Sequence, residues 1–237
     1  MTKRKNILSV NADSKTSKGT KIGFLTAALF GAPAKLSGYQ VCPMSPLAQC
    51  EKPCLNSAGR GKFNSVQKAR INKTKRFFED RENFMLDLIY SINALVRKAE
   101  REGLTPLVRL NATTDIRWEN IRHDGLTIFE HFPDVQFYDY TKIPNRKNIP
   151  KNYDLTFSYS GVDTYQKAVQ KAKQNKNLKR IAVVFSHKER IPQTFQGLPV
   201  VSGDDTDVRH MDGEGVIVSL FAKGDAKKDT SGFVVQV

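Results

Sequence analysis

Cysteine is scarce in this sequence, and all of it lies in one place. Cys42, Cys50 and Cys54 are the only cysteines among 237 residues. A secreted scaffold held by disulfides favours an even and denser set of cysteines, so this odd count argues against one. Three cysteines gathered within one short segment are instead typical of a ligand set in a reducing compartment. The alternative is that they are three unreactive thiols.

Long apolar runs are also missing. No stretch approaches the ~20 apolar residues that span a bilayer. Lys3, Arg4 and Lys5 precede only a short apolar run, and no small-residue cleavage site follows it. The chain also lacks a Walker phosphate-binding motif and a Gly-x-Ser-x-Gly nucleophile turn. We therefore expect a soluble cytoplasmic protein without a membrane partner that is neither a P-loop nucleotide hydrolase nor a serine hydrolase.

Acidic residues are the minority charge. The chain has 24 Asp and Glu against 38 Lys and Arg, which gives a net charge of +14. Such a field attracts nucleic acids and nucleotides, although it also serves simply to keep a protein soluble. A helix predicted to start near Val66 carries the candidate nucleic-acid contacts Arg70, Lys73, Lys75 and Arg76. Protein partners cannot be named from the sequence.

Hydrophobic patterning predicts the fold class. Helices are expected over residues 66–76, 81–102 and 164–175, and strands in PLVRLNA, VQFYDYT, DLTFSYS, RIAVVFS, LPVVSG and GVIVSLFAKG. The apolar segment KIGFLTAALFG is either a further short strand or a turn of helix. Strands separated by helices are typical of parallel βα units. We predict an α/β fold with a partial (βα) barrel-like parallel sheet, an N-terminal cysteine loop over residues 42–54, and helices. Residues 1–20 are expected to be a flexible segment and residues 21–237 a single domain.

The cysteine spacing is Cys-x7-Cys-x3-Cys. Three thiolates leave one iron of a cubane cluster without a protein ligand, and that iron is then open to a cofactor, a substrate or a fourth residue. A structural zinc site needs four ligands. His123, His131, His187 and His210 are the candidates for the fourth, but none has a zinc-finger spacing. We expect a [4Fe-4S] cluster, with zinc as the alternative.

Polar residues at the carboxyl ends of parallel strands usually face the ligand site. On this basis Asn111, Asp115 and Lys142 are the candidate catalytic residues, and Arg109, Asn111 and Ser158 are candidates for cofactor binding. The alternative is that these groups only cap strands and loops. A segment with Asp204, Asp205, Asp207 and Asp212 is dense enough in carboxylates to bind magnesium, or it pairs with the many Lys and Arg residues.

Four segments carry a resemblance to a known family: CPMSPLAQCEKPCLNSAGRG, VQKARINKTKRFFEDRENF, VRLNATTDI and FPDVQFYDYTK. They resemble the phage family called gene product eighty-eight, over roughly residues 13–237. The resemblance implies a phage-encoded protein of the host cell cytoplasm.

More distantly, the layout is similar to that of radical S-adenosylmethionine enzymes, which place a three-cysteine loop after the first strand of a partial barrel. In them the fourth iron binds the amino and carboxylate groups of S-adenosylmethionine, so the resemblance implies that cofactor here. Their usual spacing is Cys-x3-Cys-x2-Cys, and Pro53 stands where they have an aromatic residue. Cofactor binding is therefore less supported than cluster binding.

Two hypotheses follow. The first is a phage-encoded, radical-enzyme-like iron–sulfur protein whose substrate the sequence does not name. The second is a zinc-stabilised nucleic-acid-binding phage accessory protein.

Overall fold

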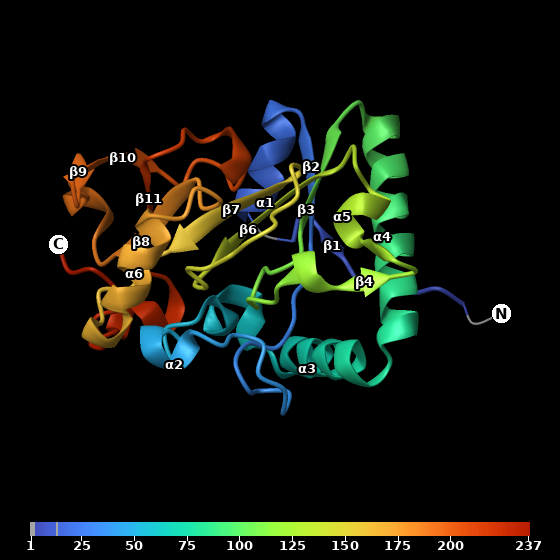
Figure 1. The fold of residues 1–237 in the computed structure, drawn as a ribbon, viewed down its shortest axis with the longest axis horizontal. Coiled ribbons are helices and arrows are strands. Elements are labelled where there is room, and N and C mark those ends of the chain that lie inside the picture. Colours follow the sequence, from blue (N-terminus) through green and yellow to red (C-terminus); the bar gives the residue numbers. More distant parts are fainter. Residues whose placement is uncertain (1–2, 13) are drawn as a thin grey trace.

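A nine-stranded sheet forms the centre of the protein. The computed structural model describes residues 3–12 and 14–237. The strand order in the sheet is β1-β2-β3-β6-β7-β8-β11-β10-β9 (Figure 1). The strands are β1 (Ser9–Val10), β2 (Phe24–Ala28), β3 (Thr105–Arg109), β6 (Gln136–Thr141), β7 (Tyr153–Ser158), β8 (Arg180–Phe185), β9 (Thr194–Phe195), β10 (Leu198–Ser202) and β11 (Ile217–Phe221). A separate hairpin pairs β4 (Arg122–His123) with β5 (Leu126–Thr127).

Six of these strands are parallel and lie side by side in chain order. β2, β3, β6, β7, β8 and β11 pair in that sequence, each parallel to the next. β10 adds a further parallel strand beside β11. The short strands β1 and β9 are antiparallel to their neighbours and form the two edges of the sheet. The sheet is therefore open and does not close into a barrel. This arrangement confirms the predicted α/β class with a mostly parallel sheet, in the strand order expected of a partial barrel.

The helices are α1 (Ser14–Lys18), α2 (Ser45–Ala48), α3 (Asn64–Glu79), α4 (Arg81–Glu102), α5 (Ile128–His131) and α6 (Gln166–Lys173). Of these, α4, α5 and α6 pack on one face of the sheet, whereas α1 lies on the other face, where Lys18 Nζ donates to the Asp204 carbonyl. In α4, buried residues recur at three- and four-residue spacing, among them Leu88, Ile92 and Leu95, and they pack on β2 and β3. Gly103 ends this helix with φ of 64°, a conformation that glycine adopts without strain. α6 packs Val169 onto β7 and β8 in the same way.

The other face of the sheet is unusually polar. Because side chains alternate along a strand, Tyr138 and Tyr140 lie on the opposite face from the core residue Phe137. The segment 204–212 covers this face, where Asp207 accepts a hydrogen bond of 2.6 Å from Arg109. Asp212 lies 3.1 Å from Arg209. Two of the four acids that suggested magnesium therefore pair with arginines, as the alternative interpretation holds.

The start of the chain is packed rather than loose. Residues 1–20 were expected to be flexible, but Ile7 and Leu8 are buried in the main core. The Ile7 amide donates to Ser91 Oγ at 2.9 Å, and Lys73 Nζ donates to the Ile7 carbonyl at 2.8 Å. The polar composition of the segment did not indicate this packing, because few of its side chains, Ile7, Leu8 and the partly buried Val10 among them, supply the apolar contact. Residues 1, 2 and 13 of the expected segment lie outside the described part of the chain.

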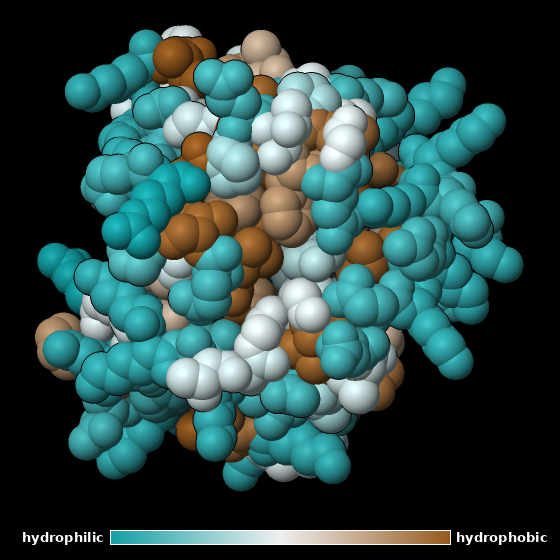
Figure 2. Space-filling view, turned by 90° about the vertical axis from the view of Figure 1, so that its left-hand side faces the viewer, coloured by the Kyte–Doolittle hydropathy of each residue, from teal (hydrophilic) through white to brown (hydrophobic). Residues whose placement is uncertain are grey.

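Figure 2 looks at the side of the molecule where β9, β10 and α6 lie in Figure 1, and apolar side chains are visible there between polar ones. A groove opens between the end of α6 and the amino ends of β8 and β10. Its apolar lining includes Leu178, Ile181 and Leu198, with Lys173 and Lys179 beside them. Over the described residues, no helix combines the length and apolar character needed to cross a membrane.

Candidate metal centre

The cysteine loop, residues 42–54, lies across the carboxyl ends of the parallel strands. It follows β2 and leads through α2 and a short 3-10 helix, Leu55–Ser57, into α3. Three hydrogen bonds hold it to the strand ends. The Asp115 amide donates to Val41 O at 2.9 Å, Ser160 Oγ to Ala48 O at 2.9 Å, and Thr164 Oγ1 to Leu47 O at 2.8 Å.

The far end of the loop is fixed to α3. Arg70 donates to the Asn56 side chain, and Gln67 donates to the Asn56 carbonyl at 3.1 Å. Gly61 lies against the same carbonyl, since a Cβ at this position would come within 2.5 Å of Asn56 O. The loop is thus clamped at both ends, which limits how far its three thiols can separate.

The three thiols share one electrostatic environment. All are free and only partly accessible, and the charges of Cys50 and Cys54 both act on Cys42. Burial raises the pKa of each thiol, that of Cys50 to about 11. The thiols are therefore neutral near pH 7 in the absence of a metal. The Asn56 amide also donates to Cys54 Sγ at 3.5 Å, a bond that would stabilise a thiolate.

Lys142 is the predicted site residue whose pKa all three cysteines affect. Its ammonium donates to Ser158 O at 3.2 Å, Ser158 Oγ at 3.1 Å and Tyr159 O at 3.3 Å. Burial lowers the pKa of Lys142, while all three cysteines and Asp115 act to raise it. The ammonium also lies 4.6 Å from the ring centroid of Phe233, and Cys50 packs against the cluster that contains this ring, so Lys142 and its partner Ser158 lie near the cysteine loop.

Asp115 lies next to this group but is engaged within the fold. Its carboxylate accepts from Thr141 Oγ1 at 2.7 Å and from the Lys142 amide at 2.8 Å. The buried Arg146 adds a contact of 3.4 Å. Asp115 therefore joins the end of β6 to the loop that also holds Val41.

Asn111 and Arg109 are likewise occupied by partners in the protein. Asn111 Oδ1 accepts from Thr114 Oγ1, the Ile116 amide and Trp118 Nε1, and its amide group donates to the Ile116 carbonyl. These bonds build the turn that follows β3. Arg109 is on the polar face of the sheet, paired with Asp207. Their roles in catalysis and cofactor binding stay predictions.

None of the described histidines joins the cysteines. His123 contacts Glu82 and Asp124, His131 bonds to the His123 carbonyl, and His210 packs on Phe24. His187 bonds to Ser186 after β8. In the described part of the chain, no three His, Cys, Asp or Glu side chains are arranged to hold a single metal ion.

Most of the candidate nucleic-acid contacts on α3 are used inside the protein. Arg70 is buried on Asn56, and Lys73 bonds to the Ile7 carbonyl. Arg76 lies 2.7 Å from Asp87. Among these four cations, Lys75 alone is an exposed residue.

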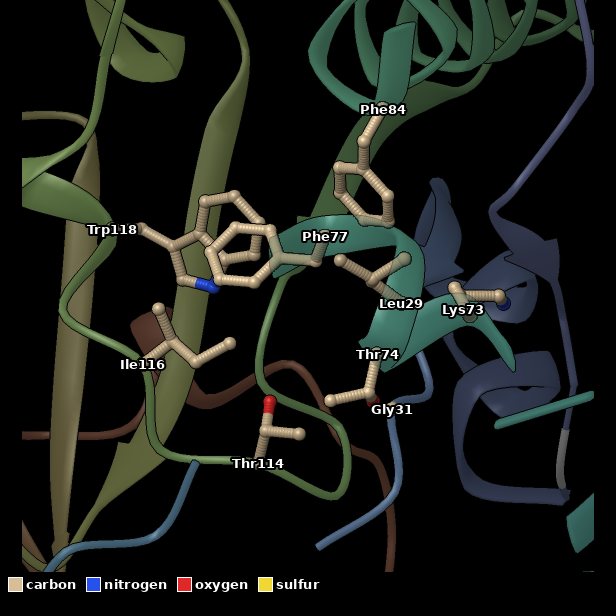
Figure 3. A pocket seen from close by; sticks show the side chains of 9 residues that line it. All are labelled: Leu29, Gly31, Lys73, Thr74, Phe77, Phe84, Thr114, Ile116 and Trp118. Carbon is tan, nitrogen blue, oxygen red and sulfur yellow. The ribbon is translucent and has the colours of Figure 1, made fainter. Parts of the chain in front are cut away.

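Thr164, Gln67 and Asn56, which help to clamp the loop, could not be recognised from the sequence, because hydroxyl and amide groups carry no spacing motif. The sequence also did not indicate the buried pair of Arg146 and Glu119, 2.7 Å apart. A cavity of about 20 Å³, room for one water, lies between α3, the segment after β2 and the segment after β3. Figure 3 shows it between the rings of Phe77, Phe84 and Trp118 and the hydroxyls of Thr74 and Thr114.

Fold and site together define a class: an α/β protein with an open, sequentially ordered parallel sheet and a three-cysteine loop on its carboxyl edge. The model of one family, described as Gene product 88, matches residues 2–237. The chain therefore belongs to the Gene product 88 family, as its motifs predicted. No curated protein and no solved structure shows a significant match to it.

Proposed function

We propose that this protein is a phage-encoded iron–sulfur protein whose [4Fe-4S] cluster is held by Cys42, Cys50 and Cys54. The observation that carries the proposal is the clamped cysteine loop at the carboxyl edge of the parallel strands, where ligand sites of such sheets usually lie. The three thiols interact electrostatically there with one another and with a buried ammonium.

The residues present suit a cluster chemically. Three thiolates would bind three irons and leave the fourth iron open. The Asn56 amide, which donates to Cys54, would stabilise a sulfur ligand. The positive charges of Lys142 and Arg70 act on Cys54 and offset its negative charge when it binds. When bound, the cluster would supply one-electron redox chemistry and an open coordination position.

The strand order supports an enzyme of the radical S-adenosylmethionine kind as the finer form of this proposal. The cysteine loop follows β2, the first of six parallel strands that pair in chain order. Ser158 and Lys142, at the carboxyl ends of β7 and β6, are the residues that we expect to contact a cofactor bound at the open iron. The substrate stays undefined.

Anaerobic purification followed by analysis for iron, sulfide and zinc tests the proposal. We expect a brown protein with sulfide, iron and an absorbance near about 400 nm from sulfur-to-iron charge transfer. Cys50→Ser should lose the colour, whereas Ser65→Ala, an exposed substitution in α3, should keep it. A colourless wild-type preparation without iron or sulfide contradicts the proposal.

A zinc-stabilised nucleic-acid-binding protein is the second candidate function. The distribution of charge favours it, because residues 29–76 contain nine Lys and Arg but only one acid, Glu51, a net charge of +8. More than half of the net charge thus lies in about a fifth of the chain, on and around the cysteine loop. Zinc without iron or sulfide in the same elemental analysis would select this candidate.

A further inference from the structure

Lys142 is a buried cation without a carboxylate partner of its own. The residue as a whole is partly accessible, but its ammonium has three oxygen acceptors and two aromatic rings around it. The ion pairs found within 4.0 Å in the described part of the chain do not include it. A buried charge is costly unless it is paired, so a cation kept here calls for a nearby anion.

The groups around the Lys142 ammonium indicate where the compensating anion would bind. The Ser158 and Tyr159 oxygens take its three hydrogen bonds, and these partners are uncharged. The rings of Phe233 and Tyr165 have their centroids 4.6 Å and 5.5 Å from Nζ. Cys50 packs against the cluster that contains Phe233, so the ammonium and the cysteine loop both lie near this ring. The titratable groups that affect the pKa of Lys142 are Cys42, Cys50, Cys54 and Asp115.

Asp115 supplies only part of the compensation. Its carboxylate is shared among Thr141, the Lys142 amide and the guanidinium of Arg146, which it also partly neutralises. The cysteines add negative charge at this place when they bind a metal as thiolates. A negatively charged cluster bound to the three sulfurs would balance the remaining positive charge of Lys142.

We propose that Lys142 is the counter-ion of the cysteine-bound cluster and sets its reduction potential. This inference rests on the proposed function. Its physical basis is that reduction adds a negative charge to the cluster, and a fixed cation in a low-dielectric site stabilises the reduced form more than the oxidised form. Net charge and hydrogen bonding near the cluster are among the factors that set such potentials.

Redox titration of the anaerobic protein, followed by absorbance and electron paramagnetic resonance, tests this role. Lys142→Met removes the charge and keeps most of the volume, and we expect its reduction potential to fall below that of the wild type. Lys142→Arg keeps the charge and should stay closer to the wild type. Lys151→Met is the matched control, because Lys151 is an exposed lysine outside the cysteine loop that water screens, and the potential of this variant should not change.

The outcomes separate the two proposals. A wild-type protein without iron and sulfide overturns the proposed function and this inference with it. A cluster that forms in wild type and Lys142→Met with equal potentials overturns the inference alone. If Lys142→Met loses the cluster while Lys142→Arg keeps it, the charge is required and the inference stands. Loss in both variants shows that only the shape of lysine matters, which overturns it.

Discussion

Asp139 shows how the polar parts of this fold are held. Its carboxylate is fully buried in β6 and accepts from the Leu110 amide at 3.1 Å, the Asn111 amide at 2.9 Å and Tyr153 Oη at 3.1 Å. Burial raises its pKa to about 7, although Arg109 and these donors act in the opposite direction. The side chain thus joins the ends of β3, β6 and β7.

The pKa of Asp139 predicts a pH-dependent stability. Because the folded pKa near 7 lies above the unfolded value of about 3.9, the folded state holds a proton that the unfolded state has lost between these values. Its contribution to stability is full below about pH 4 and disappears as pH rises through about 7. Urea unfolding of wild type and Asp139→Asn at pH 5, 6, 7 and 8 measures it.

The Asn variant should be less stable at every pH, because its amide group meets backbone donors, at a cost of about 1–3 kcal/mol. It should also lose the Asp139 component of the pH dependence. A gap between the two proteins that stays constant from pH 5 to pH 8 would show that Asp139 does not titrate in this range.

The buried thiols predict proton release on metal binding. Since burial raises the pKa of Cys42, Cys50 and Cys54, each must lose a proton to bind a metal ion. Adding zinc to the metal-free protein in weakly buffered solution near pH 7.5 should release protons, which an indicator dye detects, and zinc affinity should rise with pH. Cys42→Ser should release fewer protons. Binding without any release would mean that the cysteines are not the ligands.

At the scale of elements, the position of the cysteine loop depends on a few hydrogen bonds to other segments. Ser160 and Thr164, which follow β7, hold α2 through the carbonyls of Ala48 and Leu47. Because this contact lies outside the main core, it controls the loop more than the stability of the whole domain.

Loss of the Ser160 hydroxyl should therefore loosen the loop selectively. Ser160→Ala leaves the Ala48 carbonyl without its donor, at a cost of about 1–3 kcal/mol. We expect faster amide hydrogen exchange in residues 42–54 and weaker metal retention, with little change in exchange within α4. Ser202→Ala, which removes a hydroxyl from β10 that accepts from the Asp204 amide, is the control. Equal exchange in the loop of both variants would refute the clamp.

The regular elements were largely predictable from the sequence, whereas the site was only partly so. The stripe of apolar residues and Gly103 placed α4 at residues 81–102, as observed. The expected helix at 66–76 is longer, residues 64–79, because Phe77 extends its buried face beyond the expected end. β1 and β9 were missed since two residues are too few to show alternation.

Side-chain partners across the fold were beyond the reach of sequence patterns. The cysteines were found because their spacing is local. Lys142 was found because strand ends predict sites, but its enclosure by Phe233 and Tyr165 depends on residues distant in the chain. The same limit applies to Arg70, which a helical pattern presents as a surface cation and which the fold buries on Asn56.

On the scale of the whole molecule, charge is distributed unevenly. Residues 29–76 carry a net charge of +8. Lys62, Lys68 and Lys75 are exposed, whereas Arg70 bonds to Asn56 and Arg76 pairs with Asp87 inside the protein. We expect the affinity of this surface for nucleic acid to depend on the three exposed lysines and to fall as the salt concentration rises.

The triple variant Lys62→Glu, Lys68→Glu and Lys75→Glu tests this surface. Its affinity for a single-stranded DNA oligonucleotide should be lower than that of the wild type, with a smaller dependence on salt concentration. The matched control changes three exposed lysines of α6, Lys167, Lys171 and Lys173, to Glu, so the net charge is the same. If both triple variants lose affinity equally, binding reflects only the overall charge.

Because the chain is synthesised from its amino terminus, the cysteine loop is made well before the residues that hold it in place. Ser160 lies 112 residues after Ala48, whose carbonyl it holds. At about 5–20 residues per second, the cysteines leave the ribosome roughly 6–20 seconds before the group that fixes them. Val235, which pairs with β8 near the end of the chain, comes later still. The three thiols of the loop therefore stay open to solvent until β7 and the residues after it have folded onto the loop.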